Sequence, residues 1–124
     1  MAGNTLRITP FMQVTDLAAA VRFFELLGFE AIVNDGVYAY LDREGAGMRV
    51  VQNTDPSEQG APHRGFAYYI DVRDLGLVLE QIGARLGELP DGSVIGPVNQ
   101  RYGQRELMIR APDGNVLVFG QTID

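Results

Sequence analysis

The chain of 124 residues has no cysteine, no tryptophan and no lysine, and it has one histidine. Because cysteine is missing, disulfides, thiolate nucleophiles and metal sites built on thiolates are all excluded. Long apolar runs are missing too, since no stretch approaches the roughly 18 residues that a membrane-spanning helix needs. The first residues also lack the apolar core of a secretory signal, so we expect a cytoplasmic protein.

The charge balance is acidic. Sixteen Asp and Glu residues oppose ten arginines, which gives a net charge of −6. Such a chain repels a phosphate backbone, so nucleic acid is not an expected partner, whereas cationic ligands are attracted. The same charge also serves simply to keep a protein in solution. With 46% hydrophobic and 21% charged residues, the composition is that of one globular domain over residues 1–124.

A short phrase occurs twice, as Val14-Thr-Asp-Leu17 and as Val72-Arg-Asp-Leu75. Each copy closes an alternating, strand-like run and opens an apolar stripe with helical spacing. The repeat predicts two copies of one supersecondary unit, over residues 5–53 and 66–121, joined by a proline-containing polar linker over 54–65. Neither unit is long enough to bury a good core alone, so the two must share one.

Both units predict the order strand, helix, three strands, which gives the α+β class and two β-α-β-β-β modules in tandem. In the first, Asp16 caps the helix and Gly28 ends it. In the second, Asp74 caps the helix and Gly87 ends it. The predicted strands cover residues 6–14, 29–34, 37–42, 48–52, 66–72, 93–98, 105–110 and 116–120, and the segment 93–98 is an edge strand or irregular because Gly96-Pro97 interrupts it.

Several landmarks occur in order along the chain. They are Pro10, Val14-x-Asp16-Leu17, Phe23-Phe24-Glu25-x-Leu27-Gly28-Phe29, Val72-x-Asp74-Leu75, Tyr102-Gly103 and Ala111-Pro112-Asp113-Gly114-Asn115. This pattern resembles the vicinal oxygen chelate superfamily, which includes glyoxalase I, extradiol dioxygenases and the bleomycin-resistance proteins. The resemblance covers residues 6–121 and implies a curved mixed sheet with a ligand cleft.

The superfamily's enzymes hold a divalent metal through one side chain on each of four strands, usually His, Gln or Glu. By register from the landmarks, the resemblance puts these positions at Thr9, Val50 or Val51, Ala67 and Val118. None is a good metal ligand. Gln13 and Asp71 are too few to hold a metal and suit a polar cavity lining. We therefore expect no metal, no cofactor and no catalytic residue.

Three other residues are candidates for catalysis. His63 is the only histidine and lies in the predicted linker, where a solvated loop residue is the ordinary interpretation and a proton shuttle is the alternative. Ser57 and Ser93 occur in polar turn sequence with no base nearby, which argues against a serine nucleophile.

Aromatic residues are the stronger signal for binding. Tyr38 and Tyr40 share one face of their strand, and Phe11 falls on the corresponding face of the first strand. The resemblance implies that Tyr38 and Tyr102 lie where bleomycin-resistance proteins use aromatic residues, often tryptophan, to sandwich flat heteroaromatic groups. For Tyr40 and Tyr69, filling the core is an equal alternative. The predicted cleft is lined by Phe11, Gln13, Tyr38, Tyr40, Arg49 and Tyr102.

These observations predict a metal-free, homodimeric protein that binds a small planar or cationic molecule. Its most specific form is a resistance protein that sequesters a cationic peptide antibiotic. The main alternative is a metal-dependent lyase or dioxygenase with an atypical metal site, and a third is a ligand sensor or interaction module. An enzyme would retain metal, a binding protein would be stabilised by its ligand alone, and a module would show neither.

Overall fold

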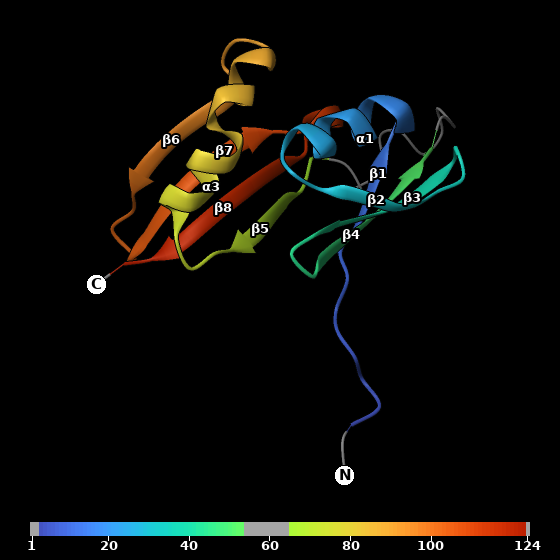
Figure 1. Cartoon of the computed structure of the whole chain (residues 1–124), viewed down its shortest axis with the longest axis horizontal. Helices are drawn as coiled ribbons and strands as arrows, with labels where there is room; N and C mark the ends of the chain where they lie inside the picture. Colours follow the sequence, from blue (N-terminus) through green and yellow to red (C-terminus); the bar gives the residue numbers. More distant parts are fainter. Residues whose placement is uncertain (1–2, 54–64, 124) are drawn as a thin grey trace.

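The computed structural model describes residues 3–53 and 65–123, which form two β-α-β-β-β modules (Figure 1). The first module contains β1 (Phe11–Val14), α1 (Leu17–Leu26), β2 (Glu30–Asn34), β3 (Tyr38–Arg43) and β4 (Ala46–Gln52). The second contains β5 (Ala67–Asp71), α3 (Leu75–Ile82), β6 (Val94–Asn99), β7 (Gln104–Arg110) and β8 (Val116–Thr122), with 3₁₀ turns at Gly83–Glu88 and Pro112–Gly114. The predicted α+β fold of two tandem modules is confirmed.

Each module has its own four-stranded mixed sheet. The strand order is β1-β4-β3-β2 in the first sheet and β5-β8-β7-β6 in the second. In both sheets the first strand runs parallel to the last strand of its module, and the other neighbours are antiparallel. The two sheets therefore have the same topology, as the repeated sequence phrase predicts, and β6 is an edge strand.

The repeat extends to single hydrogen bonds at the helix starts. Asp16 and Asp74 each accept a bond from a backbone amide in the first turn of the helix that follows, at 3.1 and 3.3 Å. The first amide of each helix instead donates to a glutamine on the last strand of the same module. Gln52 accepts it in the first module at 2.9 Å and Gln121 in the second at 2.7 Å. These bonds satisfy amides that a helix leaves without partners.

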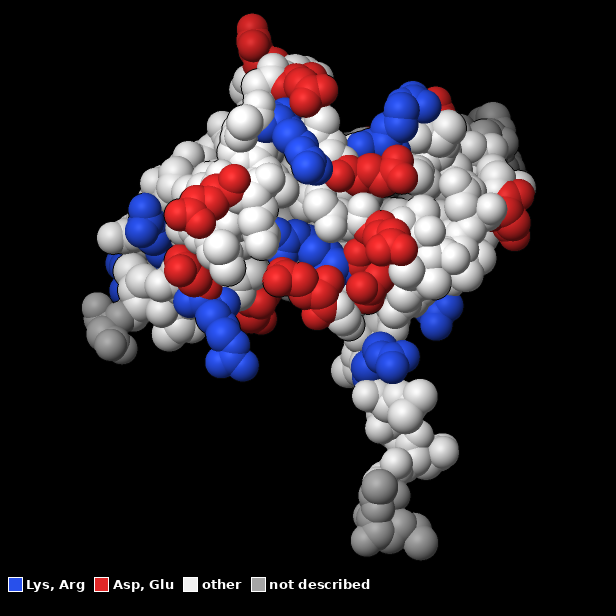
Figure 2. All heavy atoms as spheres, in the orientation of Figure 1, with Lys and Arg blue, Asp and Glu red and all other residues white. Residues whose placement is uncertain are grey.

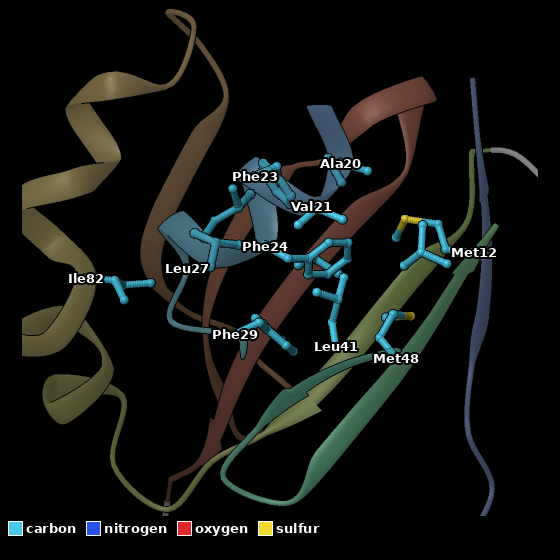
Figure 3. Close-up of a cluster of buried hydrophobic side chains, with 14 of the residues drawn as sticks. Met12, Ala20, Val21, Phe23, Phe24, Leu27, Phe29, Leu41, Met48 and Ile82 are labelled. Atoms are coloured by element: carbon cyan, nitrogen blue, oxygen red, sulfur yellow. The ribbon is translucent and has the colours of Figure 1, made fainter. Parts of the chain in front are cut away.

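One cluster of buried side chains runs through both modules (Figure 3). Phe24 of α1 is fully buried and contacts the ring of Phe29 edge-on, with the ring centroids 5.1 Å apart. Ile82 of α3 points toward Leu27 at the end of α1. Leu107, Ile109, Leu117 and Phe119 of the second sheet belong to the same cluster. The two halves thus share one core.

Arg43, at the end of β3, joins the two modules. Its side chain is only 6% exposed, so its guanidinium is buried. Its Nε donates to the carbonyl of Leu27 at 3.2 Å, and its Nη2 donates to Oε1 of Gln81 on α3 at 2.6 Å. Nη1 pairs with the exposed Glu44. The guanidinium carbon also lies 5.5 Å from the centre of the Phe119 ring.

The Ala111–Asn115 landmark supplies a second link between the modules. Both carboxylate oxygens of Asp113 accept bonds from Thr15, one from its amide at 2.8 Å and one from its hydroxyl at 3.0 Å. Asn115 is fully buried and accepts the amide of Phe66 at 3.1 Å. This turn therefore fixes the position of the second sheet against the start of α1.

Two predicted boundaries are wrong by several residues, and the others differ by at most two. The first strand begins at Phe11 and not at residue 6, because Pro10 has no amide to donate to a ladder. The preceding residues extend away from the body of the molecule (Figure 1), and Leu6 and Ile8 are exposed. Helix α3 ends at Ile82, and a 3₁₀ turn follows to Glu88, because Gly83 and Gly87 weaken a helix there.

The predicted linker over 54–65 lies outside the described residues except for Gly65, as do Ser57 and His63. In the part of the chain that is described, no helix has both the length and the apolarity to cross a membrane.

Candidate functional site

The first sheet has a covered face and an open face. Alternate residues such as Met12 and Val50 point into the core beneath α1. The residues between them point outward and align across the strands, because Phe11 pairs with Arg49 and Arg49 pairs with Tyr40. In the adjoining row, Val51 of β4 lies between Gln13 and Tyr38. Five of the six predicted site residues are therefore together on one face: Phe11, Gln13, Tyr38, Tyr40 and Arg49.

These side chains contact one another. Nη1 of Arg49 donates to the hydroxyl of Tyr38 at 2.6 Å, and the guanidinium carbon lies 5.1 Å from the centre of the Tyr40 ring. The rings of Phe11 and Tyr38 are tilted by 42° with centroids 6.5 Å apart, and Phe11 is 54% exposed. Such an arrangement offers aromatic faces for stacking on a planar group and a guanidinium that can bind an acceptor.

The β2–β3 turn positions Tyr38. The amides of Val37 and Tyr38 both donate to Oδ1 of Asp35, at 2.9 and 2.7 Å. The bonds from Val37 and then Tyr38 lower the pKa of the Asp35 carboxyl below its usual value. The turn predicted from Asp35-Gly36 therefore also fixes where the strand bearing both tyrosines begins.

A glycine on the neighbouring strand makes room for a tyrosine on each open face. Tyr40 lies over Gly47, where an added Cβ would overlap the tyrosine hydroxyl. Tyr69 lies over Gly120 in the same way, on the second sheet. Neither tyrosine belongs to the buried core cluster, and Tyr69 is 44% exposed.

Tyr102 is the predicted site residue that the fold does not bring to the first sheet. It lies in the loop between β6 and β7, and this loop is at the end of the second module that is remote from the first in Figure 1. Its hydroxyl donates to the carboxylate of Glu106 on β7, 2.9 and 3.0 Å from the two oxygens. This bond, followed by burial, raises the pKa of Tyr102. Within one chain, Tyr38 and Tyr102 therefore do not face each other.

The open face of the second sheet has a centre that sequence reasoning missed. Glu106 is only 4% exposed and lies in one row with Gly120, its partner on β8. Tyr69 lies beside it and donates to Oε1 of Gln104 at 3.2 Å. Desolvation, followed by interaction with Glu106, raises the pKa of Tyr69 to about 12. The alternation along β7 shows that Glu106 faces away from Leu107, but nothing local shows that it is buried.

A groove of about 530 Å³ lies between the modules and is lined by Arg7–Pro10, Phe29, Gly45–Met48 and Ala67–Asp71. None of the six predicted site residues lines it. The aromatic cluster on the first sheet is an open surface in a single chain.

Comparison with known proteins decides the family. The Glyoxalase/Bleomycin resistance protein/Dioxygenase superfamily matches this chain over residues 7–119. The chain belongs to that superfamily. No curated protein sequence matches it.

Solved structures of the superfamily have the same fold. A bleomycin resistance determinant encoded on the transposon Tn5 is 22% identical, with a TM-score of 0.77 over 95% of this chain and 98% of the other. A bleomycin-binding protein complexed with bleomycin is 21% identical, with a TM-score of 0.75 and coverage of 95% and 99%. The bleomycin-binding protein of bleomycin-producing Streptomyces verticillus, complexed with copper(II)-bleomycin, is 22% identical, with a TM-score of 0.74 and coverage of 99% of each chain. Likeness at this identity establishes the fold.

The superfamily's metal positions carry no suitable donor set in this chain. Phe11 and Tyr69 occupy equivalent positions in the two modules. The sheet register pairs Tyr69 with Val118 and Phe11 with Arg49. The first-sheet equivalent of Val118 is therefore Arg49, rather than Val50 or Val51. A guanidinium at that place repels a metal ion and cannot ligate one. Ala67 and Val118 offer no lone pair, and within residues 3–53 and 65–123 no three His, Cys, Asp or Glu side chains gather as metal ligands do. These residues do not fit a divalent metal.

Proposed function

We propose that this protein binds a small planar or cationic molecule without a metal ion, and that sequestration of a bleomycin-like antibiotic is the most specific form of that function. The observation that carries the proposal is the open aromatic and guanidinium cluster of the first sheet. The exposed ring of Phe11 and the half-buried ring of Tyr38 are suited to stacking, and sequestration requires only tight binding, with no bond broken. Superfamily members of the same fold whose names state that they bind bleomycin support this proposal.

The absence of suitable donors at the expected metal positions favours binding over metal-assisted catalysis. Lewis-acid chemistry needs ligands that hold the ion and leave it an open position. The net charge of −6 supports a cationic ligand, because a negative potential raises the encounter rate with cations. Acidic side chains are spread over the face seen in Figure 2, several of them near the middle of the molecule. The cytoplasm, as expected from the sequence, is where we place this activity.

We propose further that the protein is a homodimer. Phe11 and Tyr102 are 54% and 63% exposed on the open faces of different sheets, and Leu6 and Ile8 are exposed on the extended N-terminal segment. Apolar groups gathered in this way are usually covered by a partner. A second copy whose second sheet covered the first sheet of its partner would bring Tyr102 toward Tyr38, completing two equivalent clefts by symmetry.

Calorimetric titration with bleomycin, metal-free and copper-loaded, tests the binding. Tyr38→Ala removes one ring and is expected to weaken binding by about 1–3 kcal/mol, by analogy with base stacking, or roughly five- to a hundredfold. Tyr38→Phe keeps the ring face and should lose less. Leu77→Ala is the control, because Leu77 is 47% exposed on α3 and lies away from the open faces. Unchanged affinity in a folded Tyr38→Ala protein would refute the site, and absence of binding to the wild-type protein would refute the ligand.

Two further measurements test the rest of the proposal. Light scattering at micromolar concentration should give the mass of two chains, and a monomer would refute the shared clefts. Elemental analysis of protein purified without chelator should find no stoichiometric Ni, Zn, Fe or Mn. One metal per chain that resists dialysis would instead favour the lyase or dioxygenase alternative.

A further inference from the structure

Glu106 is a buried acid without a basic partner. Its residue is 4% exposed, and the hydrogen-bond donor to its carboxylate is the neutral hydroxyl of Tyr102. Glu106 forms no ion pair with another described residue, and the ion pair between Arg43 and Glu44 lies on the other module. An acid buried without a compensating charge lowers the stability of a fold, and proteins retain such groups at sites that bind a ligand or substrate.

The groups around Glu106 are those that recognise organic cations. Tyr69 and Tyr102 place two aromatic rings beside one carboxylate. Aromatic faces attract ammonium and amidinium groups, and a carboxylate forms short, charge-assisted bonds with their N–H donors. Sheet hydrogen bonds fix Glu106 on the central strand pair β7–β8, so the carboxylate is preorganised.

The cover over this carboxylate is light. Tyr102 is 63% exposed and lies in the turn between β6 and β7, next to Gly103, whose φ is +85°. Its hydroxyl donates to the Glu106 carboxylate. Tyr69 also covers the carboxylate, so rotation of Tyr102 opens one side of it to a ligand, and the Tyr102 ring remains available to stack on that ligand.

We propose that Glu106, with Tyr69 and Tyr102, forms a subsite for an organic cation on the open face of the second sheet. The inference rests on the proposed function and specifies it: the ligand carries an ammonium or amidinium group, and Glu106 selects for that charge. Acting together, the first sheet would hold the planar part of the ligand and the second sheet its cationic part.

Benzamidine and benzamide are the probes, because they share a planar shape and differ in charge. Titration of the wild-type protein should show a preference for benzamidine on the order of tenfold, as expected for one charge-assisted bond. Glu106→Gln keeps the shape of the side chain and should abolish the preference by weakening only benzamidine binding. Glu80→Gln is the matched control, since Glu80 is an exposed acid of the same length on α3 and undergoes the same change of charge. It should keep the preference.

Unfolding curves show whether Glu106 is instead structural. If Glu106 is kept for recognition, Glu106→Gln should be at least as stable as the wild-type protein, because it removes an uncompensated buried charge. A clear loss of stability would point to a structural role and contradict the proposal. Gly120→Ala gives an independent test, because its new Cβ displaces the ring of Tyr69 and leaves Glu106 unchanged. It should weaken benzamidine binding.

Three titration results would also overturn the subsite: equal affinity for both probes in the wild-type protein, an unchanged preference in Glu106→Gln, or an equal loss of preference in Glu80→Gln, which would indicate general electrostatic attraction. The bleomycin titration separates this failure from that of the proposed function. If bleomycin binds and Tyr38→Ala weakens it while Glu106→Gln does not alter the probe preference, the subsite is wrong and the proposed function stands. If bleomycin does not bind but the benzamidine preference depends on Glu106, the drug is wrong and the subsite stands.

Discussion

Replacing Arg43 by methionine tests whether one guanidinium holds the two modules together. Methionine keeps much of the apolar stem that packs in the core but removes all the donors. The carbonyl of Leu27 and Oε1 of Gln81 would lose the bonds they accept at 3.2 and 2.6 Å. Both partners come from helical segments of different modules, so the loss falls on the junction between them.

The expected destabilisation follows from these contacts. A hydrogen bond from a charged group contributes about 1.5–3 kcal/mol, and two are lost. The contact with the Phe119 ring adds about 1 kcal/mol. The pair with Glu44 adds little, because the Glu44 side chain is 68% exposed and can be solvated by water. Removal of the buried charge itself offsets part of the loss. We expect Arg43→Met to lower the free energy of unfolding by about 3–4 kcal/mol.

Urea unfolding, followed by both circular dichroism and tyrosine fluorescence, measures this loss. Arg22→Met is the matched control, since Arg22 is exposed on α1, and it should change stability by less than about 0.5 kcal/mol. The two signals should also change together, because the modules share one core. A loss below about 1 kcal/mol for Arg43→Met would refute the reasoning, and separate transitions in the wild-type protein would refute the shared core.

Three other predictions concern the core, a helix cap and a tyrosine. Phe24→Ala should lower stability by about 3–5 kcal/mol in denaturant unfolding, because it removes a fully buried ring; a loss under 1 kcal/mol would contradict the packing described. Asp74 caps the start of α3, so Asp74→Ala should lower the free energy of unfolding by about 1 kcal/mol. Asp74→Asn should retain most of the wild-type stability, and an equal loss in both variants would rule out the cap. The pKa of Tyr69 is raised to about 12, so its hydroxyl proton is held more tightly in the folded than in the unfolded chain. The stability that this proton contributes is complete below pH 10 and is lost as the pH rises toward 12. When tyrosine ionisation is followed by absorbance, the Tyr69→Phe variant should lack the transition near pH 12 that the wild-type protein shows. Loss of a transition near pH 10 instead would contradict this assignment.

Local sequence determined the elements and the faces of their strands. The repeated phrase predicted two modules because Asp16 and Asp74 cap a helix through amides only three residues away. Alternation along β1, β3 and β4 predicted the outward face that carries Phe11, Tyr40 and Arg49, because successive side chains of a strand point to opposite sides. These are short-range rules, and they need no knowledge of what packs against each element.

Tertiary structure alone decided how residues far apart in sequence meet. Tyr102 has the sequence context of a partner for Tyr38, but the fold places it on the second sheet, beside Glu106. The burial of Glu106 depends on a tyrosine 37 positions earlier in the chain, which lies over Gly120. Arg43 has the pattern of a strand-end cation, yet it is buried because α3 and the second sheet close over it. Burial and charge compensation depend on every element around a side chain, so they become defined only when the two modules pack together.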